Sequence, residues 1–385
     1  MLRARGKNTW QIVVYAGTDP TTGRERRTRE TFHGSKKQAA DRERQLVLEA
    51  RAGKYTSPDH TVAELLAAWL AQVAPDLAAT TIYNYRAMID GHLVPELGAV
   101  KLAKLTPARI DRCYVDLRAT LAPKSVRNVH AVLRRALAQG QRWGWITTNP
   151  ATLASPPKLV KPEIRPPARD DVAAFLAHLL AADPDLGTLA WLAAVTGARR
   201  GELAGLRWSD VDVDRATLLI ERSVAQTAGT TFVKDTKTHQ ARRIALDQLT
   251  LQLLGQHRAR LVDTSDATGI TFTTDLPVFP NVETFRPLHP DTITKRYRSA
   301  ADAWRARRAK ELDIDIKEIQ DLGRLHDLRH FAATQALDAG VNVRTVAGRL
   351  GHANPATTLN VYAHFLKASD QDAAEVLGEI AAGSP

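Results

Sequence analysis

The chain has 385 residues, more than one compact core usually holds, so we expect two or three domains. Its 44% hydrophobic and 25% charged residues are typical of a globular protein, and its formal net charge of +11 favours an anionic polymer as partner. The single cysteine, Cys113, excludes an internal disulfide and a zinc site with several cysteines. No apolar run is long enough to span a bilayer, and the first residues lack the apolar core of a signal peptide. We therefore expect a cytoplasmic protein without membrane contact.

The N-terminal segment predicts a strand hairpin followed by one helix. Residues 8–15 alternate as a half-buried strand does, residues 19–23 supply turn chemistry, and residues 24–31 form a second strand. Ser35 is placed to cap a helix that ends before Gly53. The second strand carries candidate DNA contacts, namely Arg24, Arg26, Arg27 and Arg29.

Much of the positive charge lies in this same segment. Residues 1–54 contain 13 Lys and Arg against 6 Asp and Glu, a net of +7. The alternative is a basic tail that only improves solubility, but the segment is patterned rather than low-complexity. A small basic sheet braced by a helix can lay its strands into a major groove, so we expect a DNA-reading module.

The next part of the chain predicts a helical domain that ends near residue 149. Its amphipathic segments are 61–73, 79–91, 107–120 and 124–143. Thr106 and Pro107 mark one helix start by an N-cap and a proline at the first helical position.

The last of these helices has two contrasting sides. Its apolar stripe consists of Val126, Val129, Leu133 and Leu137. Its other side carries cations with no acid among them, namely Lys124, Arg127, Arg134, Arg135 and Arg142. A charged face is usually only a solvated face, but the lack of acids favours contact with phosphates.

A proline-rich, basic stretch at residues 155–167 marks the clearest domain boundary. Its prolines prevent a helix and favour an extended spacer. Lys158, Lys161 and Arg165 would let that spacer follow a DNA backbone.

Beyond the spacer, the pattern predicts a mainly helical domain with one small antiparallel sheet. Asp170 caps a first helix, and residues 186–197 and 200–207 form two more. Three short strands follow at 216–223, 230–236 and 242–247, and helices resume from about residue 248. The whole chain is therefore expected to be a multidomain, mainly α protein.

Two basic positions in this domain are candidates for chemistry. Arg199 lies in TGARRGEL at a helix start, and Glu202, three residues on, can orient its guanidinium. Arg200 is an equally charged neighbour, and spacing alone does not choose between them. Lys237 lies at the turn between two predicted strands, where a lysine can give a proton to a leaving oxygen, and Lys234 is its nearest competitor.

The segment from residue 326 to 364 places His326, Arg329, His352 and Tyr362 in a fixed order. A tyrosine hydroxyl titrates near ~10 and becomes a useful nucleophile only where cations absorb the charge of the transition state. Arg329 offers a planar fork to two phosphate oxygens, and His326 can move a proton near neutral pH. Each residue alone has an ordinary structural explanation, whereas the ordered set indicates a phosphoryl-transfer site. The histidines lack Cys or carboxylate partners at ligand spacing, so we expect neither a metal nor a cofactor.

These motifs resemble those of the tyrosine recombinases, also called the phage integrase family. The resemblance rests on TGARRGEL, the KTHQARR hairpin, HDLRH, LGH and the terminal Tyr362, and it covers essentially the whole chain. It implies that Arg199, rather than Arg200, clamps the scissile phosphate together with Arg329. The chain departs from the usual pattern at Phe331, where the family often has Thr or Ser. It departs again in the ten-residue interval from His352 to Tyr362, which is one residue longer than in many relatives.

The resemblance also implies the remaining roles in the site. Lys237 would be the general acid and His326 the acid/base partner. His352 would donate a hydrogen bond to the phosphate, and Tyr362 would be the nucleophile.

The same resemblance divides the chain into four parts. These are an arm-type DNA-binding domain, a helical core-binding domain, a basic linker and a catalytic domain, at residues 1–54, 60–150, 151–167 and 168–385 respectively.

The implied function is site-specific DNA recombination through a 3′-phosphotyrosine intermediate, as an integrase of a temperate phage or an integrative mobile element. The expected partners are double-stranded DNA attachment sites, further copies of the chain in a homotetramer, an excisionase and a DNA-bending host factor. The expected location is the cytoplasm, in association with the nucleoid. An apolar stripe in residues 369–383 predicts packing on a neighbouring protomer. Two alternatives stay open: a type IB topoisomerase, whose active site is similar, and a non-catalytic DNA-binding regulator that kept the fold.

Overall fold

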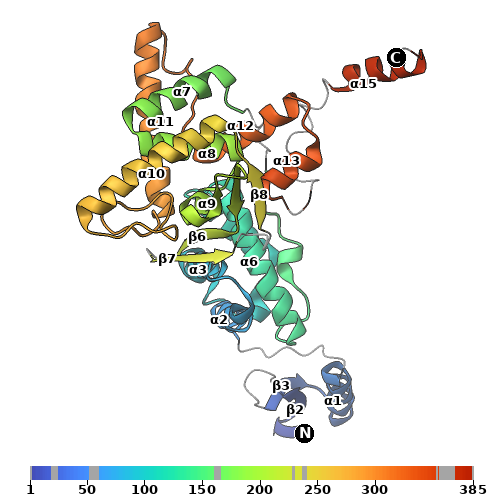
Figure 1. Ribbon diagram of the computed structural model, residues 1–385. Coiled ribbons are helices and arrows are strands. Elements are labelled where there is room, and N and C mark those ends of the chain that lie inside the picture. The colour runs from blue at the N-terminus through green and yellow to red at the C-terminus, as the bar shows by residue number, and fades with distance from the viewer. Residues whose placement is uncertain are drawn as a thin grey trace. The chain divides into compact units, whose positions relative to one another are not determined.

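The computed structural model describes residues 2–18, 25–51, 60–159, 166–227, 230–235, 241–352, 354 and 369–383. The chain separates into two compact units, Met1–Lys161 and Pro162–Pro385. Both contain more helix than strand (Figure 1), which confirms the predicted mainly α class with small antiparallel sheets.

The N-terminal part contains a three-stranded antiparallel sheet in the order β1-β2-β3 and one helix, α1. The strands are β1 (Leu2–Gly6), β2 (Thr9–Thr18) and β3 (Glu25–His33), and the helix is α1 (Lys36–Arg51). Strand β1 is an addition to the predicted hairpin. Ser35 caps α1 as expected, because its Oγ accepts from the Gln38 amide at 3.4 Å and its own amide donates to the Gln38 side chain at 2.9 Å. Ile12, Val14 and Leu46 join the sheet and the helix in a small core.

The helical part of the first unit follows the predicted pattern closely. Its main helices are α2 (Val62–Val73), α3 (Ala79–Met88), α5 (Pro107–Leu117) and α6 (Pro123–Arg142). A π-helical turn (Ile89–Leu93) joins α3 to the short α4 (Val94–Leu97), and 3₁₀ turns occupy Ala74–Asp76, Leu102–Lys104 and Pro150–Thr152. Thr106 caps α5 ahead of Pro107, and the predicted apolar stripe of α6 is buried.

The second unit is built around α8 (Pro184–Thr196), which packs against α7 (Arg169–Ala182), α10 (Gln248–Thr268) and α12 (Leu325–Asp338), as Figure 1 shows. Its other helices are α9 (Arg200–Gly205), α11 (Pro290–Leu312), α13 (Val343–Leu350) and α15 (Ser369–Ala381). The prediction that Asp170 caps α7 is wrong, because the helix begins at Arg169 and Ala168, two residues before Asp170, occupies the cap position. Asp170 instead lies in the first turn, where its charge complements the helix dipole.

The strands of the second unit form two separate sheets. The prediction of one sheet from strands 216–223, 230–236 and 242–247 is wrong in its membership. The observed three-stranded sheet is β4-β5-β8, with β4 (Val211–Asp212), which was not predicted, β5 (Thr217–Ile220) and β8 (Arg242–Ala245). Strands β6 (Arg222–Thr227) and β7 (Thr230–Asp235) pair with each other instead. The predicted strand 216–223 therefore divides at Glu221. Leu218, Ile220 and Val224 are buried at alternate positions, whereas Arg222 between the last two is only half-buried, so the alternation is interrupted next to the division.

Candidate functional site

The site lies where two helices of the second unit end. Helix α8 ends at Gly197 and α13 ends at Gly351, and both glycines have a left-handed backbone, with φ of 63° and 65°. Neither position has room for a side chain. A Cβ on Gly197 would lie 2.4 Å from Leu350, and one on Gly351 would lie 2.8 Å from the Arg242 guanidinium. The glycines of TGARRGEL and LGH thus allow the two motifs to approach closely.

Each helix end is capped by a predicted phosphate-binding arginine. Arg329, in the second turn of α12 and only 4% exposed, donates from Nη1 to the Gly197 carbonyl at 2.6 Å. Arg199, at the start of α9, donates from Nη2 to the Gly351 carbonyl at 3.1 Å. Because the carbonyl end of a helix carries partial negative charge, both contacts favour a guanidinium there.

The buried carboxylate of Glu202 is the anionic centre of the site. It accepts from the Arg199 amide at 2.9 Å and from the Arg199 guanidinium at 2.8 Å. Arg242 on β8 donates to its two oxygens at 3.2 Å and 2.6 Å. Burial alone would raise the pKa of Glu202, but the hydrogen bonds and charges of Arg242 and Arg199 outweigh it and lower that pKa below its ordinary value. Glu202 is therefore ionised and balances one of the two cations beside it.

Two histidines complete the described part of the site. His326 lies in the first turn of α12, and His352 follows Gly351, with its amide bonded to the Ala347 carbonyl at 3.0 Å. Burial lowers the pKa of His326 to about 4, helped by His330 and by the charges of Arg329 and Arg199. Burial likewise lowers the pKa of His352 to about 4, helped by Arg329, Arg199 and Arg242. Both imidazoles are therefore neutral at pH 7 and lie in a strongly positive environment.

The structure thus brings together four of the predicted catalytic residues, namely Arg199, His326, Arg329 and His352. Lys237 and Tyr362 lie outside the described residues. Arg200, the alternative to Arg199, points to a different partner set, because its Nη1 donates to Asp291 at 3.1 Å and to Thr294 at 2.6 Å. Spacing alone did not decide between Arg199 and Arg200, and these hydrogen-bond partners favour Arg199 as the residue of the site.

Sequence reasoning missed the second arginine on Glu202. Arg242 is one of two adjacent arginines in KTHQARR, and nothing in the motif separates it from Arg243. The alternation of β8 could have done so. Ile244 is buried, so Arg242 shares the inward face with it, whereas Arg243 lies on the outer face and donates to Thr217 at 3.3 Å.

The candidate DNA contacts in the first unit are surface residues wherever they are described. Lys124, Arg127, Arg134 and Arg135 are exposed on α6, and Arg27, Arg29 and Lys158 are exposed as well. Some already have protein partners: Arg127 donates to the Pro157 carbonyl at 3.1 Å, Arg135 to the Tyr85 hydroxyl, and Arg27 pairs with Glu25. Arg24 and Lys161, together with the Arg26 side chain, lie outside the described residues.

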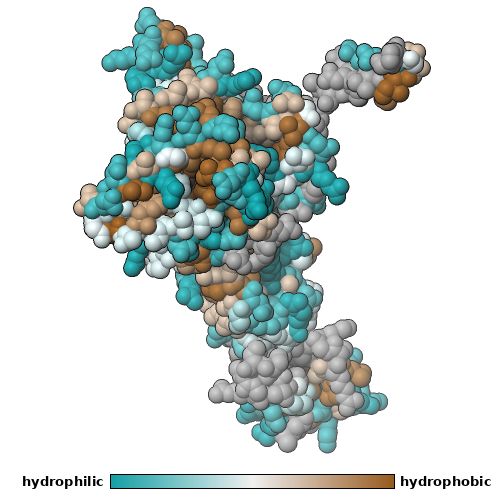
Figure 2. All heavy atoms as spheres, in the orientation of Figure 1, coloured by the Kyte–Doolittle hydropathy of each residue, from teal (hydrophilic) through white to brown (hydrophobic). Residues whose placement is uncertain are grey.

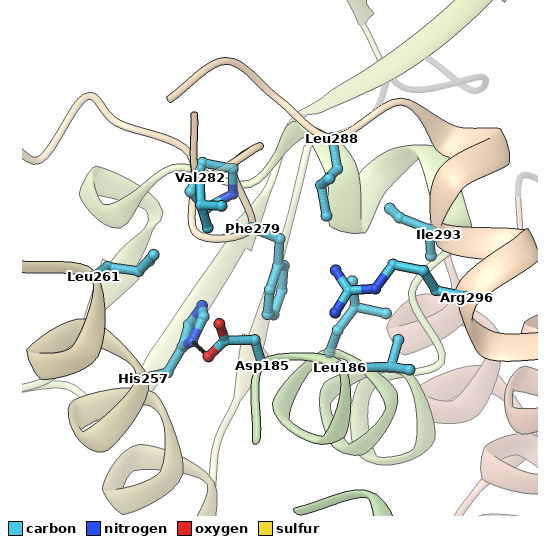
Figure 3. A pocket seen from close by; sticks show the side chains of 11 residues that line it. Asp185, Leu186, His257, Leu261, Phe279, Val282, Leu288, Ile293 and Arg296 are labelled. Atoms are coloured by element: carbon cyan, nitrogen blue, oxygen red, sulfur yellow. Dashed lines mark hydrogen bonds and ion pairs between the residues drawn. The ribbon is translucent and has the colours of Figure 1, made fainter. Parts of the chain in front are cut away.

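A small cavity in the second unit is separate from the site. It measures about 30 Å³ and is lined by Asp185, His257 and Arg296 among apolar side chains (Figure 3). His257 is buried, contacts Asp185 at 3.0 Å and donates to the Val278 carbonyl at 2.6 Å. The hydrogen bond from His257 lowers the pKa of Asp185 to about 2. The cavity shares no lining residue with the arginine site and has room for about one or two waters, so we assign it a structural role.

The lowered histidine pKa values predict a dependence of stability on pH. A histidine in the unfolded chain binds a proton near pH 6.5, whereas His326 and His352 in the folded chain do so only near pH 4. The free energy of unfolding therefore decreases as the pH falls from about 6.5 to about 4, because protons bind preferentially to the unfolded chain. After a discount for solvent screening, His352 should account for a loss of about 1 kcal/mol in the free energy of unfolding between pH 7 and pH 5. Thermal melts at the two pH values measure the loss. His352→Gln should reduce the pH dependence, and an unchanged dependence in that variant would contradict the assignment.

Comparison with known proteins agrees with this geometry. Residues 169–369 match the phage integrase family, and residues 61–117 match its N-terminal SAM-like domain. The chain belongs to the phage integrase family. It is therefore a tyrosine-type site-specific recombinase, and residues 61–117 form an N-terminal SAM-like domain of the kind found in that family.

Individual relatives in this family span almost the whole chain. It is 24% identical to the ICEBs1 integrase of Bacillus subtilis over 376 residues, covering 96% of this chain and 97% of that protein. It is 26% identical to a putative prophage phiRv2 integrase of Mycobacterium tuberculosis, and the match covers 99% of this chain and 95% of that protein. The fold is similar to that of the Tn1549 transposon integrase in complex with a circular intermediate DNA, with a TM-score of 0.68, 17% identity and coverage of 82% and 99%. A lambda integrase dimer bound to a core site matches with a TM-score of 0.58, 18% identity and coverage of 94% and 93%.

Proposed function

We propose that this recombinase integrates and excises a temperate phage or an integrative mobile element by cutting and rejoining its attachment sites. The observation that carries the proposal is the meeting of Arg199, His326, Arg329 and His352 at two helix ends. These residues form a positive site with two guanidiniums and two neutral imidazoles. That combination suits a phosphodiester, which brings the negative charge that the site lacks.

Each residue has a defined role in the proposed reaction. Arg199 and Arg329 hold the non-bridging oxygens of the scissile phosphate and stabilise the charge that develops on them. The Tyr362 hydroxyl attacks the phosphorus in line and gives a 3′-phosphotyrosyl bond, while the bond to the 5′ oxygen breaks. Lys237 donates a proton to that leaving oxygen.

The neutral histidines suit two further steps. His326 has an imidazole free of charge at pH 7, so it can accept the proton that Tyr362 loses. His352 can donate a ring N–H to a phosphate oxygen while its backbone is fixed at the end of α13. The covalent intermediate conserves the energy of the phosphodiester bond, so attack by a second 5′ hydroxyl rejoins the strand without ATP.

The proposed partners are double-stranded DNA and further copies of the chain. Solved relatives include a lambda integrase dimer on a core site and a lambda integrase tetramer on a Holliday junction, which supports a homotetramer on two synapsed sites here. In α15, Leu377 and Ile380 are 65% and 70% exposed, an apolar surface visible in Figure 2 that suits packing on a neighbouring protomer. An excisionase and a DNA-bending host factor would set the direction of the reaction. The protein would act in the cytoplasm, on DNA of the nucleoid. Among the described helices, none combines the length and the apolar character that crossing a membrane requires.

Recombination between attachment sites tests the proposed function. The DNA flanking the gene should contain one such site, which can be placed on a plasmid together with its partner. We expect the purified protein to join these sites in the recombinant order. Relaxation of any supercoiled plasmid, without recombinants and without preference for these sites, would instead indicate a topoisomerase.

The N-terminal basic module provides a second prediction. Deleting residues 1–54 removes the three-stranded sheet with its exposed Arg27 and Arg29, so binding to accessory sites outside the core should be lost. Cleavage of the core site should remain, because the four clustered residues belong to the second unit. Gel-shift assays with accessory duplexes measure the binding, and formation of an SDS-resistant adduct on a nicked core duplex measures the cleavage. Equal affinity of the truncated and full-length chains for accessory sites would contradict the assignment.

A further inference from the structure

Arg242 holds two parts of the site at once, although the proposed reaction gives it no role. Its side chain is 8% exposed and extends from the first residue of β8. Its Nε donates to the Arg349 carbonyl at 2.8 Å, in the last turn of α13. Its two terminal nitrogens donate to both oxygens of Glu202, at 3.2 Å and 2.6 Å. One guanidinium therefore ties β8 to α9 and to the end of α13.

Arg199 also bonds both Glu202 and the end of α13, although at a different carbonyl of that helix end. It donates to Glu202 at 2.8 Å and to the Gly351 carbonyl, again at the end of α13, at 3.1 Å. The four groups form a closed ring in which Arg199 and Arg242 alternate with the carboxylate of Glu202 and the carbonyl end of α13. His352 follows this ring directly in the chain, and its backbone amide completes the helix end by bonding the Ala347 carbonyl.

The ring suits arginine and no other residue type. A guanidinium can donate in a fork to a carboxylate while its Nε donates elsewhere, whereas a lysine ammonium acts as a single point charge. Gly351 adds a steric reason, because a Cβ there would lie 2.8 Å from Arg242 Nη1. Glycine at position 351 is thus required both by the left-handed turn and by the closeness of the Arg242 side chain.

We propose that Arg242 is a positioning residue for strand cleavage, which acts through Glu202 and the end of α13 to fix Arg199 and His352 against the scissile phosphate. The inference rests on the proposed role of Arg199 in clamping that phosphate. Without Arg242, Glu202 pairs with Arg199 alone and draws the guanidinium toward itself. The end of α13 also loses one of its two caps, so the backbone of His352 is held less firmly.

The test is single-turnover cleavage of a nicked suicide duplex that carries the attachment site found beside the gene. Arg242→Gln should slow the cleavage rate by about 10²-fold, the cost of a misplaced catalytic group. Its affinity for the same duplex and the final fraction of DNA cleaved should stay within about twofold of wild type. Arg242→Lys keeps the positive charge but cannot donate two parallel hydrogen bonds to the carboxylate. Its cleavage rate should therefore lie between those of wild type and Arg242→Gln. Arg243→Gln is the matched control and should cleave at the wild-type rate, because Arg243 lies on the outer face of β8.

Two outcomes would overturn the proposal. One is that Arg242→Gln, or Arg242→Lys if the Gln variant does not fold, cleaves as fast as the Arg243→Gln control. The other is a lower fraction cleaved at an unchanged rate, because that pattern means only that fewer molecules are folded.

A double variant shows whether Arg242 acts through Arg199. If it does, adding Arg242→Gln to Arg199→Ala should slow cleavage by much less than the ~10²-fold expected of Arg242→Gln alone, because only the positioning of His352 is then left to lose. Multiplying rate losses would contradict the coupling. Arg199→Ala on its own separates this inference from the proposed function. If that variant cleaves at the wild-type rate, the catalytic assignment fails, whereas a slow Arg199→Ala with a fast Arg242→Gln refutes only the positioning role.

Discussion

Arg199→Ala is expected to slow strand cleavage by about 10²–10³-fold, the usual cost of removing one donor that stabilises a developing oxyanion. The variant removes the guanidinium that we propose holds the scissile phosphate, and it leaves Glu202 with Arg242 as its partner. The loss should appear in the rate of the chemical step, measured as single-turnover cleavage of the nicked attachment-site duplex. DNA affinity should change little, because most phosphate contacts of such a protein lie outside the scissile position.

Arg200→Ala is the matched control for this experiment. Arg200 is the next residue in TGARRGEL and carries the same charge, but it bonds Asp291 and Thr294 on α11. Its side chain is 40% exposed, so its loss should cost little stability and should change the cleavage rate by less than about threefold. A loss of rate in Arg200→Ala equal to that in Arg199→Ala would mean that the second arginine of the motif, and not the first, serves the phosphate.

Tyr362→Phe is expected to abolish strand cleavage altogether. The substitution keeps the ring and removes only the hydroxyl, so the nucleophile is lost while the packing of the side chain is retained. On the nicked suicide duplex, wild type should accumulate an SDS-resistant covalent protein–DNA adduct, and the Phe variant should form none. Its binding to the same duplex provides the control, and we expect it to equal that of wild type. An adduct formed by the Phe variant would show that another residue attacks the phosphate.

The sequence predicted local structure well where a residue type has one dominant physical role. Thr106 and Pro107 marked the start of α5 correctly, and Ser35 marked the start of α1, because capping is a short-range interaction. The stripe of α6 was also correct, since a helix that covers a core needs an apolar face.

Strand pairing was harder to predict because it depends on distant residues. The chain crosses from one sheet to another at Glu221, where only the half-buried Arg222 interrupts the alternation of Leu218, Ile220 and Val224. Strand β1 was missed because it is short and four of its five residues are exposed, so its existence depends on pairing with β2. In both cases the partner strand decides the structure.

The site shows the same division between local signal and long-range contact. The order of Arg199, His326, Arg329 and His352 in the sequence predicted that these residues share a site, but not what holds them together. The structure adds that α8 and α13 end beside each other and that arginines cap both ends. Arg242 was missed for this reason, because its partners Glu202 and Arg349 are far from it in the chain.

The most direct test of the central claim is to identify the amino acid that becomes linked to DNA. Wild-type protein is trapped on the nicked suicide duplex, the adduct is digested with protease and nuclease, and the modified peptide is sequenced by mass spectrometry. The account predicts one modified peptide, with the 3′ phosphate of the cleaved strand attached to the oxygen of Tyr362. A phosphate attached to a serine or to any other tyrosine, or a cleaved strand with no attached peptide, would contradict it.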